Sequence, residues 1–222
     1  QRVEYLFGLF TRKMLSFIDS INVTPGPLSV FRKSIFDALG GYQVGNISED
    51  QEMALRIQEN KYKIACSLEA DVFTAVPSSL PELVKQRVRW YRGGLRNFFK
   101  YTHLISPKYG DFGVLMMPLA IISTIALFLV LGLSAHTFLT KSQSFSPSLE
   151  DFLLGLTPFS VLSLLVMLST VAWTLMGLRQ LHRESLPLDH LILYLVLYAP
   201  LVTLFWLATA FREITKSSLK WS

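Results

Sequence analysis

The sequence is poor in the residues that usually form disulfides or hold structural metals. Cys66 is the only cysteine among 222 residues, and the four histidines are scattered without ligand spacing. A single thiol excludes an internal disulfide and is typical of a reducing compartment. Zinc sites need several Cys or His ligands at short spacings, and phosphate loops need clustered glycines, so we predict neither in this chain.

The features of an N-terminal leader are also missing. Residues 1–5 contain neither a basic n-region nor an apolar h-region, and there is no initiator Met. Because the opening residues have the pattern of the middle of a helix, we expect the chain to be a fragment of a longer protein. Charged residues make up only 17%, and the net charge of +5 is concentrated before residue 112. Such a basic surface usually meets membrane headgroups or phosphates, and nucleic acid is not an expected partner.

Charge is absent from three long segments of the second half, residues 112–133, 152–178 and 191–211. Each is longer than the roughly 18–20 residues that a helix needs to cross a bilayer core. We predict about three transmembrane helices, near 112–133, 152–178 and 189–211, in the plasma or cytoplasmic membrane. The distribution of lysine and arginine places the first 111 residues in the cytoplasm, but the basic tail opposes that rule and leaves its own orientation open.

The first 111 residues have the mixed, periodic character of a globular domain. Periodicity, caps and breakers predict helices near 1–18, 34–39, 48–60 and 79–101, and strands at 28–31, 62–66 and 70–76. Alternating strands and helices are typical of an α/β fold. We therefore divide the chain into a partial α/β domain at 1–78, an amphipathic interfacial helix at 79–111 and a transmembrane α-helical region at 112–222.

The predicted helix at 79–101 is basic and has two distinct faces. Its apolar stripe, with spacings of 4, 3, 4 and 3 residues, comprises Val84, Val88, Tyr91, Leu95 and Phe98. The opposite side carries Gln86, Arg89, Trp90 and Gly93. One interpretation is a basic helix that lies on the membrane surface. The other is a carbohydrate site, because an aromatic ring stacks on a sugar while amide and guanidinium groups bind hydroxyl or diphosphate oxygens.

Two adjacent acids, Glu49 and Asp50, follow Ser48 at the start of the predicted 48–60 helix. A capping box explains them structurally, with Ser48 as N-cap, acids in the first turn and Gln51 as the partner. The functional interpretation is that a carboxylate, with Asp50 as the candidate, takes a proton from an attacking sugar hydroxyl. The start of a rigid helix is a suitable place for such a base.

These motifs follow one another in a recognisable order. The chain carries Gly26-Pro27-Leu28, Gly40-Gly41-Tyr42, Ser48-Glu49-Asp50, Gln86-Arg87-Val88-Arg89-Trp90 and then the uncharged segments. This order resembles the processive inverting family 2 glycosyltransferases, the superfamily of cellulose, chitin, hyaluronan and poly-N-acetylglucosamine synthases. The resemblance implies that residues 1–78 are the C-terminal part of a GT-A-like catalytic domain.

The resemblance also implies roles for individual residues. Asp50, with Glu49 beside it, would supply the catalytic base. The acceptor and diphosphate side of the site would be lined by Gln86, Arg89 and Trp90 of the Gln-x-x-Arg-Trp motif and by Gly26, Pro27 and Leu28. Together these residues imply an inverting, processive hexosyl transfer onto a growing polysaccharide.

One part of the family pattern is missing. Members bind a UDP-sugar or similar nucleotide-sugar donor and a divalent metal, Mg or Mn, through an Asp and an Asp-x-Asp motif upstream of the Glu-Asp pair. No Asp-x-Asp occurs in this chain. We therefore expect the donor and metal ligands to lie outside it, while the glycan acceptor and the lipid bilayer meet residues that are present. The alternatives are a non-processive transferase acting on a lipid or lipid-linked acceptor, and a membrane scaffold or transport subunit with a degenerate transferase domain.

Overall fold

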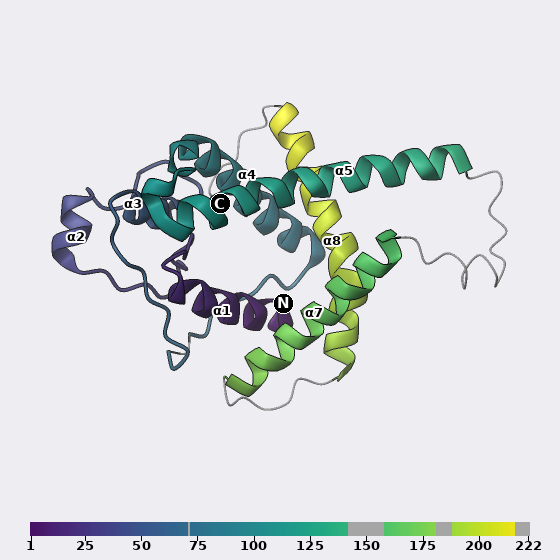
Figure 1. The fold of residues 1–222 in the computed structure, drawn as a ribbon, viewed down its shortest axis with the longest axis horizontal. Helices are drawn as coiled ribbons and strands as arrows, with labels where there is room; N and C mark the ends of the chain where they lie inside the picture. Colours follow the sequence, from purple (N-terminus) through teal and green to yellow (C-terminus); the bar gives the residue numbers. More distant parts are fainter. Residues whose placement is uncertain (71, 142–157, 181–187, 216–222) are drawn as a thin grey trace.

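The computed structural model describes residues 1–70, 72–141, 158–180 and 188–215, and all regular structure in those ranges is helical. The helices are α1 (Arg2–Phe17), α2 (Lys33–Ala38), α3 (Glu49–Glu59), α4 (Leu80–Lys100), α5 (Met117–Lys141), α7 (Pro158–Gln180) and α8 (Leu188–Ile214). Short turns join α4 to α5: η1 (Thr102–Leu104), η2 (Pro107–Tyr109) and the π-helical η3 (Phe112–Met116). Figure 1 shows α5 projecting from the other helices as a long arm, while α1 lies beside α7.

The four helices predicted in the first 111 residues are confirmed, each to within a few residues. α2 is followed by Gly40 and Gly41, whose φ angles of 79° and 71° glycine adopts without strain. α4 starts after Ser79, whose side chain accepts a hydrogen bond from the amide of Glu82, and Pro81 lies in the first turn. Local caps and stops therefore set these boundaries.

The three predicted strands are not found among the described residues, and the α/β class stays a prediction. Residues 28–31, 62–66 and the described part of 70–76 form neither strand nor helix. A strand requires a hydrogen-bonded ladder with a neighbour, and no described segment supplies one. The side chains that favoured a strand are left exposed instead, most clearly Phe73, which is 97% exposed.

Two helical segments are long and apolar enough to cross a membrane. The windows Phe112–Leu129 and Asp189–Ile214 have mean hydropathies of 2.4 and 2.2, and only 17% and 6% of them is buried inside the protein. Neighbouring side chains would cover the core helix of a soluble protein far more fully. In α7 the apolar stretch Leu164–Gln180 is shorter, and α8 continues through Pro200. Residues 152–157 of the predicted middle span lie outside the described residues, so the third span stays a prediction.

The middle of α4 contacts α8 through one residue of the apolar stripe and two arginines. Tyr91 stacks on Trp206 of α8 with ring centroids 4.6 Å apart. Arg92 and Arg96 both pair with Glu213 near the end of α8, with N–O distances of 3.0 and 3.1 Å. The predicted interfacial helix is therefore held against a candidate membrane span between Tyr91 and Arg96.

The main buried cluster ties α3 to the end of α4 and the base of α5. It consists of Leu55, Tyr101, Leu104, Phe112 and Met117. Full burial of one large apolar side chain contributes about 1.5–3 kcal/mol, so this cluster fixes where α3 lies. It is α3 that carries the two candidate acids.

Candidate active site

Helix α4 crosses the beginning of α3 at a position without a side chain. A Cβ atom added to Gly93 would lie 2.0 Å from Oγ and 2.7 Å from Cβ of Ser48. This close approach of α4 to Ser48 leaves no room for a side chain at position 93. The next residue, Gly94, faces Gln51 at ordinary spacing, since its added Cβ would lie 3.6 Å from the amide oxygen. The start of α3 is thus held directly against α4.

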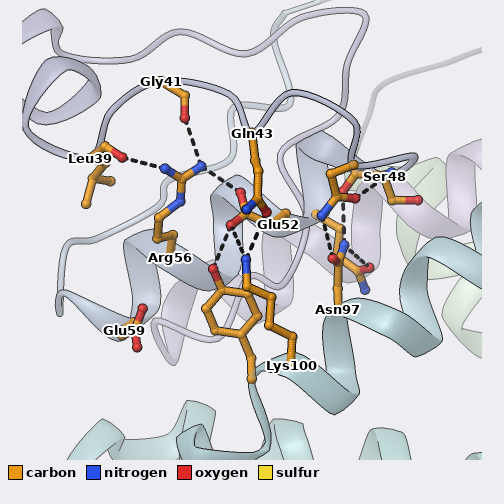
Figure 2. Close-up of polar contacts among 12 residues, drawn as sticks. Leu39, Gly41, Gln43, Ser48, Glu52, Arg56, Glu59, Asn97 and Lys100 are labelled. Atoms are coloured by element: carbon orange, nitrogen blue, oxygen red, sulfur yellow. Dashed lines mark hydrogen bonds and ion pairs between the residues drawn. The ribbon is translucent and has the colours of Figure 1, made fainter.

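Asn97, one turn further along α4, fixes this crossing with hydrogen bonds (Figure 2). Its Nδ2 donates to the carbonyl oxygen of Ser48 at 3.0 Å and to Oε1 of Gln51 at 3.3 Å. Asn46 donates to Asn97 Oδ1 at 2.8 Å and accepts from the Ser48 amide at 2.9 Å. Both ends of the buried Asn97 amide are satisfied, so a shift of α4 along α3 would break several bonds at once.

Ser48 occupies the N-cap position of α3, but the predicted capping box is wrong. The Ser48 side chain makes no capping hydrogen bond, and its Oγ lies at the Gly93 contact instead. The amide that it would have capped, that of Gln51, donates to Oδ1 of Asp50 at 2.8 Å. Contact with α4 therefore decides where the Ser48 side chain lies, and the aspartate takes over its local role.

The Asp50 carboxylate lies beside the Gly-Pro-Leu segment. A Cβ added to Gly26 would lie 3.9 Å from Asp50 Oδ2, and Thr24 Oγ1 donates to the Asp50 carbonyl oxygen at 2.8 Å. Burial raises the pKa of Asp50, against the opposing hydrogen bond from the Gln51 amide, and the charge of Glu49 adds to the rise. Two predicted site segments that are distant in sequence are therefore brought together.

The Gly26-Pro27-Leu28 segment itself is open to solvent. Gly26, Pro27 and Leu28 are exposed, and the turn is closed by Ser29 Oγ, which donates to the Pro25 carbonyl at 2.8 Å. The segment thus forms an exposed rim next to a half-buried carboxylate. A ligand that reaches Asp50 from this side would touch the rim.

The Gln-x-x-Arg-Trp motif lies along the α4 face that crosses α3. Gln86, Trp90, Gly93 and Asn97 are separated by 4, 3 and 4 residues, so they follow one side of the helix. Trp90 is 37% exposed. Gln86 Oε1 is buried with no hydrogen-bond partner among the described residues, and Arg89 is half-buried. An unpaired buried acceptor is uncommon and is a candidate for binding a hydroxyl group.

No hydrogen bond or ring contact joins Asp50 directly to Trp90 in the part of the chain that the structure describes. Their connection runs through the crossing, because Trp90 lies about one helical turn, roughly 5 Å along α4, from Gly93. Gly93 in turn touches Ser48, two residues before Asp50. Gln86 lies one turn beyond Trp90, on the same face.

Comparison with known proteins assigns this chain to a family. A family model described as "Glycosyl transferase family group 2" matches residues 8–211. The chain belongs to glycosyl transferase family group 2. The resemblance drawn from the motif order is confirmed, and the match runs from α1 to α8 through both candidate acids and the Gln-x-x-Arg-Trp motif.

Two curated relatives illustrate the similarity of this family 2 chain. A poly-beta-1,6-N-acetyl-D-glucosamine synthase of Staphylococcus aureus (strain COL) is 32% identical over 105 residues, and one of Staphylococcus epidermidis is 31% identical over 105 residues. Each match covers 45% of this chain and 25% of the relative. The chain therefore matches about a quarter of the length of these relatives. No solved structure matches the chain.

Sequence reasoning missed a buried carboxylate next to the candidate site, Glu52 (Figure 2). Its side chain is 1% exposed, between α3 and the end of α4. Oε1 accepts from the Tyr101 hydroxyl at 2.6 Å and from Lys100 Nζ at 3.3 Å, and Oε2 accepts from Arg56 at 2.6 Å. Burial alone would raise the pKa of Glu52, but these hydrogen bonds and the Arg56 charge together lower it.

Arg56 extends the same network to the loop before α3. Its guanidinium donates to the carbonyl oxygens of Leu39 and Gly41, so the Gly-Gly-Tyr segment is tied to α3 (Figure 2). The spacing of Glu52 and Arg56 indicates a helical ion pair, but such pairs are usually exposed and weak. Nothing in the sequence marks this one as buried.

The described residues do not form a divalent-metal site. Among them, no three His, Cys, Asp or Glu side chains gather closely enough to hold a metal ion. Glu49 and Asp50 are the two adjacent acids at the start of α3, and the other carboxylate nearby, Glu52, is already occupied by Arg56 and Tyr101.

Proposed function

We propose that this chain forms the acceptor side of a membrane-bound, inverting glycosyltransferase that extends a polysaccharide. The observation that carries the proposal is the crossing of α4 and α3, where the face bearing Gln86 and Trp90 meets the helix start bearing Asp50. Family membership supports glycosyl transfer, and the relatives' names support a polysaccharide product.

Asp50 is proposed as the general base. It takes the proton of an acceptor hydroxyl as the O–H bond breaks, and the oxygen forms a bond to the anomeric carbon of the donor sugar. The bond from that carbon to the diphosphate breaks, and its electron pair leaves with the nucleoside diphosphate. Attack opposite to the leaving group inverts the anomeric configuration. The raised pKa of Asp50 suits this role, because a base is most effective when its pKa lies nearer the working pH.

The Gln-x-x-Arg-Trp motif of α4 is proposed to bind both the acceptor sugar and the diphosphate leaving group. The partly exposed Trp90 ring would stack on the acceptor sugar. The unpaired Gln86 oxygen would accept from a hydroxyl, and Arg89 would stabilise charge that develops on the diphosphate. Gly26, Pro27 and Leu28 would form the rim that the acceptor passes.

The membrane and the donor complete the proposal. The windows in η3–α5 and in α8, together with a third span near 152–178, would anchor the protein in the bilayer with the α1–α4 half in the cytoplasm. The nucleotide-sugar and a divalent metal, Mg or Mn, would be bound by residues outside this chain. That metal would neutralise diphosphate charge when bound.

The test is sugar transfer by the full-length protein in membranes, from radiolabelled nucleotide-sugars. Trp90→Ala should raise the acceptor KM by about 2- to 13-fold and leave donor hydrolysis near the wild-type rate, because stacking is worth roughly 0.5–1.5 kcal/mol. Phe99→Ala is the matched control, since Phe99 is an exposed aromatic residue on the same helix.

Each result has a defined consequence. Long labelled products support polymerisation, whereas a single added sugar rules it out in favour of a non-processive transferase. No transfer with any nucleotide-sugar would favour the scaffold alternative. Equal loss of transfer and hydrolysis in Trp90→Ala would assign the ring a structural role instead.

A further inference from the structure

A largely buried ionic network includes Arg87, the second residue of the Gln-x-x-Arg-Trp motif, and joins helices α4, α1 and α8. Arg87 of α4 is 3% exposed, and its Nη1 and Nη2 atoms lie 2.8 and 2.9 Å from the two carboxylate oxygens of Glu4 on α1. The hydroxyl of Tyr198 on α8 donates to Glu4 Oε1 at 2.9 Å. Both carboxylate oxygens of Glu4 are therefore bound, while the buried Arg87 Nε has no hydrogen-bond partner among the described residues.

The same guanidinium supports the aromatic ring of the site. Arg87 Cζ lies 4.2 Å from the centroid of the Trp90 ring, within the range of a cation–π contact. Two of the guanidinium nitrogens are held by Glu4, so the plane of the group is fixed before it meets the ring. Trp90 therefore rests on a support whose position is set by α1 and α8.

We propose that Arg87 is a positioning residue that sets the orientation of Trp90, and that Glu4 and Tyr198 transmit the position of α8 to it. The inference rests on the proposed acceptor role of Trp90. Tyr198 lies inside the apolar window of α8, so a shift of this candidate span relative to α1 would change how Glu4 holds Arg87. The Trp90 ring, as the proposed acceptor-stacking residue, is thereby coupled to the candidate membrane span in α8.

A second buried arginine on the same helix provides a matched control. Arg92 is 2% exposed and binds Glu213 of α8 at 3.0 and 3.4 Å. Its known contacts tie α4 to α8 as well. Replacing either arginine by lysine keeps the charge but removes the planar two-point contact, so both changes should lower stability. Only Arg87→Lys should disturb Trp90.

The experiment measures acceptor KM, donor hydrolysis and thermal unfolding for the full-length protein in membranes or detergent. Arg87→Lys should raise the acceptor KM by up to roughly 30-fold with donor hydrolysis retained, because a lysine ammonium is not held at two points by Glu4 and no longer fixes the cation over the Trp90 ring. Arg92→Lys should lower the unfolding temperature without this selective change. Equal acceptor KM values for the two variants would overturn the proposal.

Tyr198→Phe tests the connection to α8 with less risk to folding, because it removes one hydroxyl from a ring that stays stacked on Tyr194. It should raise the acceptor KM in the same direction as Arg87→Lys, by a smaller factor. An unchanged KM in Tyr198→Phe would refute the coupling. Absence of sugar transfer by the wild-type protein would instead refute the proposed function, so the two failures are distinguishable.

Discussion

Gly93→Ala tests the helix crossing on which the candidate site depends. The added methyl group would lie 2.0 Å from Ser48 Oγ, 2.7 Å from Ser48 Cβ and 3.2 Å from Ile47 Cγ1. The hydroxyl can rotate away, but the Ser48 Cβ atom is fixed by its backbone. The two helices must therefore separate, and because Ser48 is the N-cap of α3, the start of α3 moves away from α4.

The expected cost follows from two opposing effects. Overpacking in a well-packed site typically costs about 1–3 kcal/mol. Alanine in place of glycine within a helix returns up to about 1 kcal/mol. Gly93→Ala should therefore lower the free energy of unfolding by up to roughly 2 kcal/mol. Gly94→Ala is its neighbour and matched control, because its Cβ meets only ordinary contacts, with Gln51 at 3.6 and 3.8 Å, and should be neutral or stabilising.

The assay compares thermal unfolding and sugar transfer of the two variants. At about 2–4 °C per kcal/mol, Gly93→Ala should unfold several degrees below Gly94→Ala. It should also lose most of its transfer activity, because Asp50 moves away from the face of α4 that bears Trp90. Identical unfolding temperatures and activities for the two alanine variants would refute the close crossing.

Two further predictions concern the carboxylates of Glu52 and Asp50 on α3. Glu52→Gln should destabilise the protein by about 3–5 kcal/mol at neutral pH, since it leaves the Arg56 charge without its partner, whereas Glu59→Gln, at a more exposed pair with His103, should cost about 1 kcal/mol or less. Because the pKa of Glu52 is lowered, the stability that it contributes is present above the ordinary carboxylate range and is lost as the pH falls through the lowered pKa. Plots of unfolding free energy against pH for the wild type and Glu52→Gln should therefore converge in acid. A constant gap between them would contradict this. The pKa of Asp50 is raised, so its contribution to stability is present in acid and is lost as the pH rises through that pKa. Asp50→Asn should therefore unfold at a higher temperature than the wild type at neutral pH, with the difference disappearing below the ordinary carboxylate range; a lower unfolding temperature at neutral pH would show that the charge is stabilising.

The helices of the first half were predictable because their signals are local. Ser79 with Pro81, and Gly40 with Gly41, act on their own backbone, and the structure places helix ends there. The strand signals were also local, but a strand forms only with a partner, and the exposed side chain of Phe73 has none among the described residues.

The site was predictable as a set of residues rather than as an arrangement. Spacing placed Gln86, Trp90 and Gly93 on one side of α4, but only the structure identifies Ser48 as the partner of Gly93. Glu52 is buried by residues far from it in sequence, and Arg87 likewise pairs with the distant Glu4. Such pairings depend on tertiary packing, which helical periodicity does not encode.

The most direct test of the central claim is the transfer rate of Asp50→Asn in the full-length protein, measured beside Asp37→Asn. Asp37 is an exposed carboxylate paired with Lys33 on α2, so its replacement should leave transfer unchanged. Asp50→Asn keeps the size of the side chain and an oxygen for the Gln51 amide, but it removes the base. We predict a folded protein with transfer reduced by at least about 100-fold, the usual contribution of a general base. Turnover at the wild-type rate in folded Asp50→Asn would contradict the claim.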